Sequence, residues 1–292
     1  MSWARLSLVL LLALGACADI TPHWGRPGGM SRVLAIPLAV RLAVPPPAEA
    51  LLSNEGADVF ANALAEALQA VDVPAVATTT PQPLDWRLQI TASNTGSTVQ
   101  PRFEILNADG RSQTAFQGTA IPTAAWAEGS PELLRSVAAQ AAPRVTQALL
   151  SVQAARASAT PAALQAGPSR VRLMPVRGAP GDGNLALGNR MREFLGTKGY
   201  VVQDIAEGAA YGVTAEVAVV PGSPGTNRVE IQWIVSRRDG HELGRVVQIN
   251  EVPLGSLNRF WGDVAYVAAQ EAAGGVETII NNANTLPPAG SG

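Results

Sequence analysis

The side chains that most often carry enzyme chemistry are scarce in this chain. Its 292 residues include two histidines, His23 and His241, and one cysteine, Cys17. A zinc site draws on several His, Cys or carboxylate ligands, and a nucleophilic triad needs a histidine beside its nucleophile. The sequence therefore predicts no metal centre and no catalytic residues, and we expect neither a cofactor nor enzymatic activity.

Cys17 closes a leader that has the layout of a secretory signal. Arg5 gives a positive start, Leu6 to Leu14 is an apolar run too short to span a bilayer, and Leu14 to Cys17 reads Leu-Gly-Ala-Cys. This pattern resembles the lipobox of bacterial lipoproteins. The resemblance implies that residues 1–16 are a signal peptide, that the thiol of Cys17 receives a diacylglycerol, and that the new amino group is acylated, as by palmitate. Two or three acyl chains make a durable anchor.

Two other interpretations of the leader stay open. Ala16 and Ala18 satisfy the small-x-small rule for ordinary signal cleavage after Ala18, and Cys17 would otherwise be an incidental apolar residue. Within the lipobox resemblance, the Ala at position 18 implies sorting to the outer membrane, on its periplasmic face. Asp19 lies one place too late to act as the usual retention signal.

The remaining polar motifs favour structural roles. Gly178 to Gly183 precedes a helical pattern but lacks the Gly-Lys-Ser/Thr ending of a phosphate loop. Arg238 to Glu242 has the composition of a solvated turn. An enzyme that uses carboxylates would need two of them facing each other in one cleft, and the matched repeats supply only two candidate pairs, Glu66 with Glu193 in helices and Asp109 with Asp239 at turns.

Composition excludes several classes of partner. Hydrophobic residues make up 47% of the chain, charged residues 15%, and the net charge is -2. Nucleic-acid binding needs a basic surplus, so we expect no nucleic-acid partner. Aromatic residues are only 5%, and Trp126 and Trp261 are predicted to pack in the core near the closing helices.

The part of the chain after the leader contains an internal sequence repeat, which predicts a duplication. Four matches occur in the same order: Ser31–Leu38 with Ser169–Val176, Phe60–Leu68 with Leu187–Leu195, Asp109–Gly110 with Asp239–Gly240, and Val137–Gln140 with Val267–Gln270.

Each copy is expected to be an α+β sandwich of the β-α-β-β-β-β-α type, with a mostly antiparallel sheet and two helices. The first copy is predicted to open with a strand at 32–40 and to close with a helix at 131–152 that Pro143 kinks or breaks. The closing helix of the second copy is predicted at 257–281. The expected organisation is a signal peptide (1–16), a membrane-proximal tether (17–30), a first repeat (31–152), a linker (153–168), a second repeat (169–284) and a flexible tail (285–292).

Two polar pairs occupy matching positions in the first helix of each copy. Asn62 with Glu66, and Asn189 with Glu193, are spaced i, i+4. They form either a polar interface between the repeats or a solvated helix face.

A strand that ends in Pro, then a helix, then Gly-Tyr-Val-Val ending at Val202 resembles small periplasmic modules. These are the amino-terminal domain of TolB, the lipoprotein activators of peptidoglycan synthases and the curli-secretion lipoprotein. The resemblance implies a protein-binding or assembly role at the cell envelope. We therefore expect a lipid-anchored, non-catalytic envelope protein of a Gram-negative-type bacterium, whose partners are the membrane and another envelope protein. The alternative is a carrier of a lipid or small apolar ligand, held in a cleft between the repeats.

Overall fold

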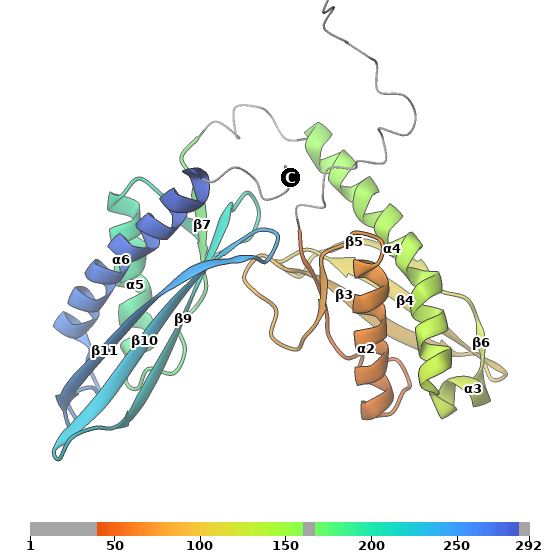
Figure 1. Ribbon diagram of the computed structural model, residues 1–292, viewed down its shortest axis with the longest axis horizontal. Helices are drawn as coiled ribbons and strands as arrows, with labels where there is room; N and C mark the ends of the chain where they lie inside the picture. The colour runs from red at the N-terminus through yellow and green to blue at the C-terminus, as the bar shows by residue number, and fades with distance from the viewer. Residues whose placement is uncertain (1–39, 160–166, 286–292) are drawn as a thin grey trace, which may run out of the picture. The chain divides into compact units, whose positions relative to one another are not determined.

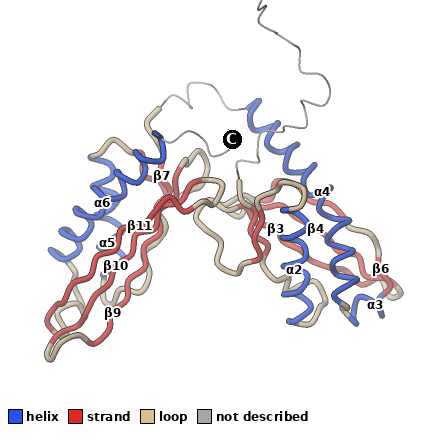
Figure 2. Tube along the Cα trace, viewed as in Figure 1, coloured by secondary structure: helices blue, strands red, loops and turns tan. Residues whose placement is uncertain are grey.

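Each half of the chain folds as a mixed sheet that carries its helices on one face (Figures 1 and 2). The computed structural model describes residues 40–159 and 167–285, all of which belong to one unit, Pro37–Gly292. Cys17, His23 and the predicted signal peptide and tether lie outside the described residues, as do residues 286–292 of the predicted tail.

The first repeat builds a six-stranded sheet in the order β2-β1-β3-β4-β5, with β6 paired to β4. Strand β1 runs parallel to β2 and β3, and the other pairs are antiparallel. Its elements are β1 (Leu42–Val44), α2 (Asn54–Gln69), β2 (Ala75–Ala77), β3 (Trp86–Asn94), β4 (Thr98–Leu106), β5 (Ser112–Gln117), β6 (Ile121–Pro122), α3 (Thr123–Glu128) and α4 (Pro131–Ala159).

The second repeat has the same topology without counterparts of β6 and α3. Its five strands lie in the order β11-β10-β9-β7-β8, and β7 runs parallel to β8 and β9. Its elements are β7 (Arg170–Leu173), α5 (Gly183–Thr197), β8 (Val201–Gln203), β9 (Tyr211–Pro221), β10 (Thr226–Arg237), β11 (Glu242–Pro253) and α6 (Gly262–Thr285). The predicted α+β class and the two similar sandwich units are therefore confirmed.

The strand predicted at 32–40 to open the first repeat falls almost wholly on residues 32–39, which lie outside the described residues. The strand that matches β7 in its pairing is β1, at Leu42–Val44. The true counterpart of Arg170–Leu173 is thus Arg41–Val44. Both candidate segments are apolar runs followed by proline, so periodicity alone could not separate them.

Two hydrophobic cores, one in each repeat, account for the burial pattern. The first helices contribute Phe60, Leu64 and Leu68 in one repeat and Leu187, Met191 and Leu195 in the other, all fully buried. The closing helices present matching inward stripes: Leu134, Ala138, Ala141, Ala142, Val145 and Leu149 in α4, and Ala265, Ala269, Ala272, Ala273, Val276 and Ile280 in α6.

Trp126 and Trp261 lie in these cores, as predicted, with 1% of each exposed. Each indole also joins its closing-helix region to the loop before the first helix. Trp126 Nε1 donates to the carbonyl oxygen of Ala50 at 2.7 Å, and Trp261 Nε1 donates to that of Pro180 at 2.9 Å. An equivalent indole hydrogen bond thus occurs within each repeat, in addition to the common topology.

The closing helices run further than the sequence indicated. Helix α4 continues through Pro143 to Ala159, so the beginning of the predicted linker is helical. An exposed proline removes one backbone donor, and the inward stripe on both sides of it holds the helix to the sheet. Within the described residues, no helix is long and apolar enough to cross a membrane.

Candidate functional site: the junction of the two repeats

A tight turn between β4 and β5 carries Asp109 toward the second repeat. The buried Asn107 side chain forms this turn, since its Oδ1 accepts from the backbone N–H of Asp109 at 3.1 Å and of Arg111 at 2.8 Å. Asp109 Oδ1 in turn accepts from the backbone N–H of Ala206, in the β8–β9 loop, at 2.7 Å. The side chain of Asp109 is only 9% exposed, so this turn packs against the second repeat.

Arg172 on β7 pairs with Asp109 from the second repeat. Its guanidinium lies 3.5 Å from Asp109 Oδ1 and donates to the carbonyl oxygens of Pro83 and, at 3.2 Å, Ala108. Burial lowers the pKa of Arg172 from its ordinary value, and the nearby Asp109 carboxylate opposes that shift. One guanidinium thus ties β7 to two loops of the first repeat.

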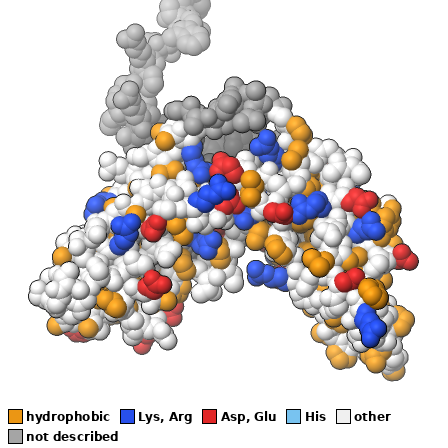
Figure 3. Space-filling view, turned by 180° about the vertical axis from the view of Figure 1, so that it is seen from behind, with side chains coloured by type: hydrophobic (Ala, Val, Ile, Leu, Met, Phe, Trp, Pro, Cys, Tyr) orange, Lys and Arg blue, Asp and Glu red, His pale blue; other side chains and the backbone are white. Residues whose placement is uncertain are grey.

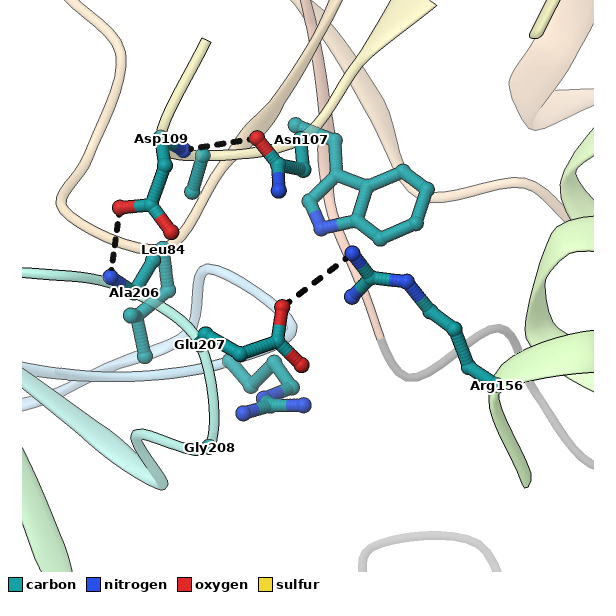
Figure 4. A pocket seen from close by; sticks show the side chains of 10 residues that line it. Leu84, Asn107, Asp109, Arg156, Ala206, Glu207 and Gly208 are labelled. Atoms are coloured by element: carbon teal, nitrogen blue, oxygen red, sulfur yellow. Dashed lines mark hydrogen bonds and ion pairs between the residues drawn. The ribbon is translucent and has the colours of Figure 1, made fainter. Parts of the chain in front are cut away.

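A second ion pair lies beside the first one. Arg156 near the end of α4 pairs with Glu207 at 3.2 Å, and its guanidinium stacks over the Trp86 ring, 4.9 Å from the centroid. Figure 4 shows Asp109 pointing to Ala206 and Arg156 pointing to Glu207. Arg238 donates to the carbonyl oxygen of Ala209, and burial lowers its pKa.

These side chains fill the junction. The cavity among them measures only ≈ 20 Å³, the size of about one water molecule. A second hollow, of ≈ 230 Å³, lies between the Thr80–Pro83 loop and Met174 to Arg177, and its lining includes Glu216 and Glu242 as well as prolines. Ligand pockets usually measure about 300–1,000 Å³ and are mostly apolar. The junction therefore offers a poor site for an apolar ligand.

The junction is roughly reciprocal. The β10–β11 turn of the second repeat approaches Arg41 at the start of the first: a Cβ on Gly240 would lie 2.3 Å from Arg41 Nε. Arg41 itself makes two hydrogen bonds, of 2.9 and 2.6 Å, to the buried carboxylate of Asp85. Each repeat thus brings its β-turn against an arginine of the other repeat, Arg172 within β7 and Arg41 just before β1.

The structure does not bring the predicted polar-interface residues together. Asn62, Glu66, Asn189 and Glu193 all lie on exposed helix faces. Asn62 donates to the carbonyl oxygen of Asp58 in its own helix, and Glu193 pairs with Arg190 at 2.7 Å. The polar contacts between the repeats come instead from Arg172 on β7, Arg156 near the end of α4, and the turn and loop residues that they meet. In the sequence, the one feature that marks Arg172 is a charge between two apolar residues, Val171 and Leu173, of a predicted strand.

The other candidate motifs have structural partners. Asp182, in the glycine-rich segment, accepts from the backbone N–H of Trp261 at 2.8 Å. His241 is exposed, and its backbone N–H donates to Asp239 Oδ1 at 3.0 Å. Across residues 40–159 and 167–285 there is no group of three or more His, Cys, Asp or Glu that could hold a metal ion. On the face shown in Figure 3, acidic and basic side chains are interspersed.

Comparisons with known proteins give no family for this chain. No protein-family model matches it, and no curated protein matches it. Solved structures that match part of this chain include the PelC dodecamer from Paraburkholderia phytofirmans, at 12% identity and a TM-score of 0.28, covering 36% of this chain and 85% of that one.

Two lipoproteins are among the similar solved structures. Lipoprotein GNA1162 from Neisseria meningitidis is 15% identical, with a TM-score of 0.24, covering 41% of this chain and 100% of that one. A minor lipoprotein from Acinetobacter baumannii is 12% identical, with a TM-score of 0.24, covering 41% and 96%. At these scores the likeness carries no argument about function.

Proposed function

We propose that this protein is a lipid-anchored envelope protein of a Gram-negative-type bacterium, with a non-catalytic role in protein binding or assembly. The anchor is a lipid on Cys17, and the expected location is the periplasmic face of the outer membrane. The leader that ends at Cys17 and the Ala at position 18 support this placement. The proposal includes no enzymatic activity.

The filled junction is the observation that most directly supports protein binding rather than the transport of an apolar ligand. Ion pairs centred on Arg172 and Arg156 occupy the place where a ligand cleft between the repeats would lie. The two hollows left there, ≈ 20 Å³ and ≈ 230 Å³, are smaller than the usual pocket for a drug-sized molecule, about 300–1,000 Å³, and the larger one is lined by Glu216 and Glu242. What each repeat offers to a partner is its outer surface, including a free sheet edge at β5 and at β11.

The anchor is tested by Cys17→Ser. Mass spectrometry of the mature amino terminus should find diacylglycerol and an amide-linked acyl chain on Cys17, and radiolabelled palmitate should enter the wild-type chain only. The variant should keep its leader or leave the membrane fraction. An unmodified terminus at Asp19 would contradict the anchor.

The binding role is tested separately with the full lipidated chain. After cross-linking in cells and solubilisation in detergent, capture of the protein should recover a stoichiometric envelope partner. Cys17→Ala serves as the control for membrane proximity, because it removes the thiol and leaves the body unchanged. Repeated recovery of the protein alone would contradict the role.

A further inference from the structure

The two repeats differ sharply at one equivalent place, where the closing helix meets the last strand. Phe103 pairs with Phe116 across β4 and β5, and Trp233 pairs with Val246 across β10 and β11. These pairs correspond because each lies at the same point of its meander. The inward stripes of the closing helices align Val145 with Val276, so the residues that precede them, Arg144 and Gly275, also correspond.

In the second repeat the helix and the edge strand are in direct contact. A Cβ on Gly275 would lie 2.6 Å from Val246 Cγ2, so only glycine permits this approach. Gln248 Nε2 donates to the carbonyl oxygen of Ala268 and to Glu271, both at 3.1 Å. Strand β11 is thereby fastened to α6.

In the first repeat, Arg144 occupies the position that corresponds to Gly275 of the second repeat. The Arg144 guanidinium lies 4.5 Å from the centroid of the Phe116 ring and donates to the carbonyl oxygen of Gln117 at 2.6 Å. Two hollows open on either side of it, of ≈ 210 Å³ and ≈ 430 Å³, and both are lined by Phe116 and Arg144. We call them together the α4–β5 groove.

The groove is long and mostly apolar. Its helix side runs from Leu133 to Ala155, an advance of about 33 Å at 1.5 Å per residue. Its apolar lining comprises Phe103, Phe116, Ile121, Leu133, Val137 and Val152. This length exceeds what a compact ligand needs and matches about nine or ten residues of extended peptide.

The charge of the groove lining and the exposed edge of β5 indicate which kind of molecule the groove binds. No Asp or Glu lines either hollow, and Arg144 forms no ion pair with a carboxylate in the described part of the chain. Among the described strands β5 pairs only with β4, and apart from the Gln117 carbonyl oxygen, which accepts from Arg144, its outer edge has backbone donors and acceptors beside the groove. A free strand edge beside apolar hollows suits the addition of a peptide strand, with the hollows receiving alternate side chains.

We propose that the α4–β5 groove binds an extended segment of a partner protein, added as a strand to the edge of β5. Apolar side chains two positions to either side of a central Asp or Glu enter the two hollows, and the carboxylate pairs with Arg144. Residues two apart in a strand lie about 6.8 Å from one another on one face, which suits the alternation of hollow, cation and hollow. This inference rests on the protein-binding role proposed above and assigns its site.

A phage-displayed library of random nonapeptides, selected on the full chain in detergent, tests the proposal. Enriched peptides should carry apolar residues two positions before and after an Asp or Glu. Gln140→Trp should weaken their binding about tenfold or more, because the exposed Gln140 lines the groove and a tryptophan there fills it. Ala139→Trp, also exposed and outside the lining, is the matched control and should bind normally.

Two measurements distinguish specific peptide binding from nonspecific hydrophobic adsorption. Selection on Arg144→Glu should replace the acidic residue of the enriched peptides by Lys or Arg. Hydrogen exchange should show new protection of β5 amides on peptide binding, and peptides N-methylated on the edge that faces β5 should bind about tenfold or more weakly.

Several outcomes would overturn the assignment. These are no enrichment at all, equal binding to Gln140→Trp and wild type, or displacement of every peptide by dodecanoate, which would mark the groove as a site for amphiphiles. If the Gln140→Trp variant still recovers the cross-linked partner in cells, the protein-binding role is supported, and only its assignment to the α4–β5 groove is contradicted. If no partner is recovered by the wild type, the role itself falls.

Discussion

The guanidinium of Arg172 lies 3.5 Å from the carboxylate of Asp109, and the two residues belong to different repeats. Their side chains are 13% and 9% exposed, so the pair brings together two opposite charges that water reaches only slightly. This pair is the polar centre of the junction, whereas Asn62, Glu66, Asn189 and Glu193 lie on exposed helix faces, the second of the two roles that the sequence left open for them.

Replacing Arg172 should destabilise the protein more than replacing an exposed arginine. Arg172→Ala leaves the Asp109 carboxylate buried and unpaired, and we expect a loss of about 3 kcal/mol in the free energy of unfolding. The double variant with Asp109→Asn should lose less than the sum of the two single changes. Urea unfolding measures both. Arg190→Ala, which breaks the exposed pair with Glu193, is the control and should cost about 0–1 kcal/mol. Equal losses for Arg172 and Arg190 would refute the structural role of the junction pair.

A buried carboxylate in the first repeat makes a second prediction. Asp85 has no exposed side-chain surface, takes two hydrogen bonds from Arg41 and accepts a third, of 2.7 Å, from the backbone N–H of Gln82. Arg41→Ala should cost about 3–5 kcal/mol, because an isolated buried charge remains. Arg41→Lys should recover only part of this loss, since an ammonium cannot make the two-pronged contact. Full recovery with lysine in chemical unfolding would contradict this geometry.

Local sequence patterns predicted much of the fold, but they could not predict which distant segments of the chain pair with each other. The alternation and turn residues of each meander, and the 3.6-residue stripes of the helices, are encoded locally, so the sandwich class could be inferred. Strand β1 could not be placed, because a strand of only Leu42–Val44 is identified by its pairing with β2 and β3 rather than by its composition.

The junction shows the same limit. An Asp-Gly turn has one local signal whether it faces water or another repeat, so Asp109 and Asp239 looked alike. Their environments differ, because Asp109 meets Arg172 while Asp239 pairs with Arg237 of its own strand. The α4–β5 groove likewise depends on Arg144 and Phe116, which are apart in sequence and have no mutual spacing to detect.

Two adjacent glycines in α6 should respond to alanine in opposite directions. A Cβ on Gly274 would meet nothing within 4 Å, so Gly274→Ala should stabilise the protein by about 0.5–1 kcal/mol through helix propensity. Gly275→Ala would place its Cβ 2.6 Å from Val246 and should cost about 1–3 kcal/mol through overpacking. Thermal unfolding of both variants compares them directly. Equal stabilisation by the two changes would show that α6 does not need its close contact with β11.

The Asp239 turn should make one contribution to stability that disappears in acid. Burial alone would raise the pKa of this carboxylate, but hydrogen bonds from Arg237, at 2.9 Å, and from the backbone N–H of His241 outweigh it and hold the pKa below its ordinary value. A group whose pKa is lower in the folded state stabilises that state above its unfolded pKa, about 3.9, and loses this effect as the pH falls through the folded value. Wild type should therefore unfold at a higher temperature than Asp239→Asn at pH 6–7, and the gap should narrow below about pH 4. Glu128→Gln, which removes an exposed carboxylate far from that turn in the sequence, is the control for the loss of one acidic side chain. A gap for Asp239→Asn that widened on acidification would mean that the carboxylate is destabilised in the fold, contrary to its hydrogen bonds.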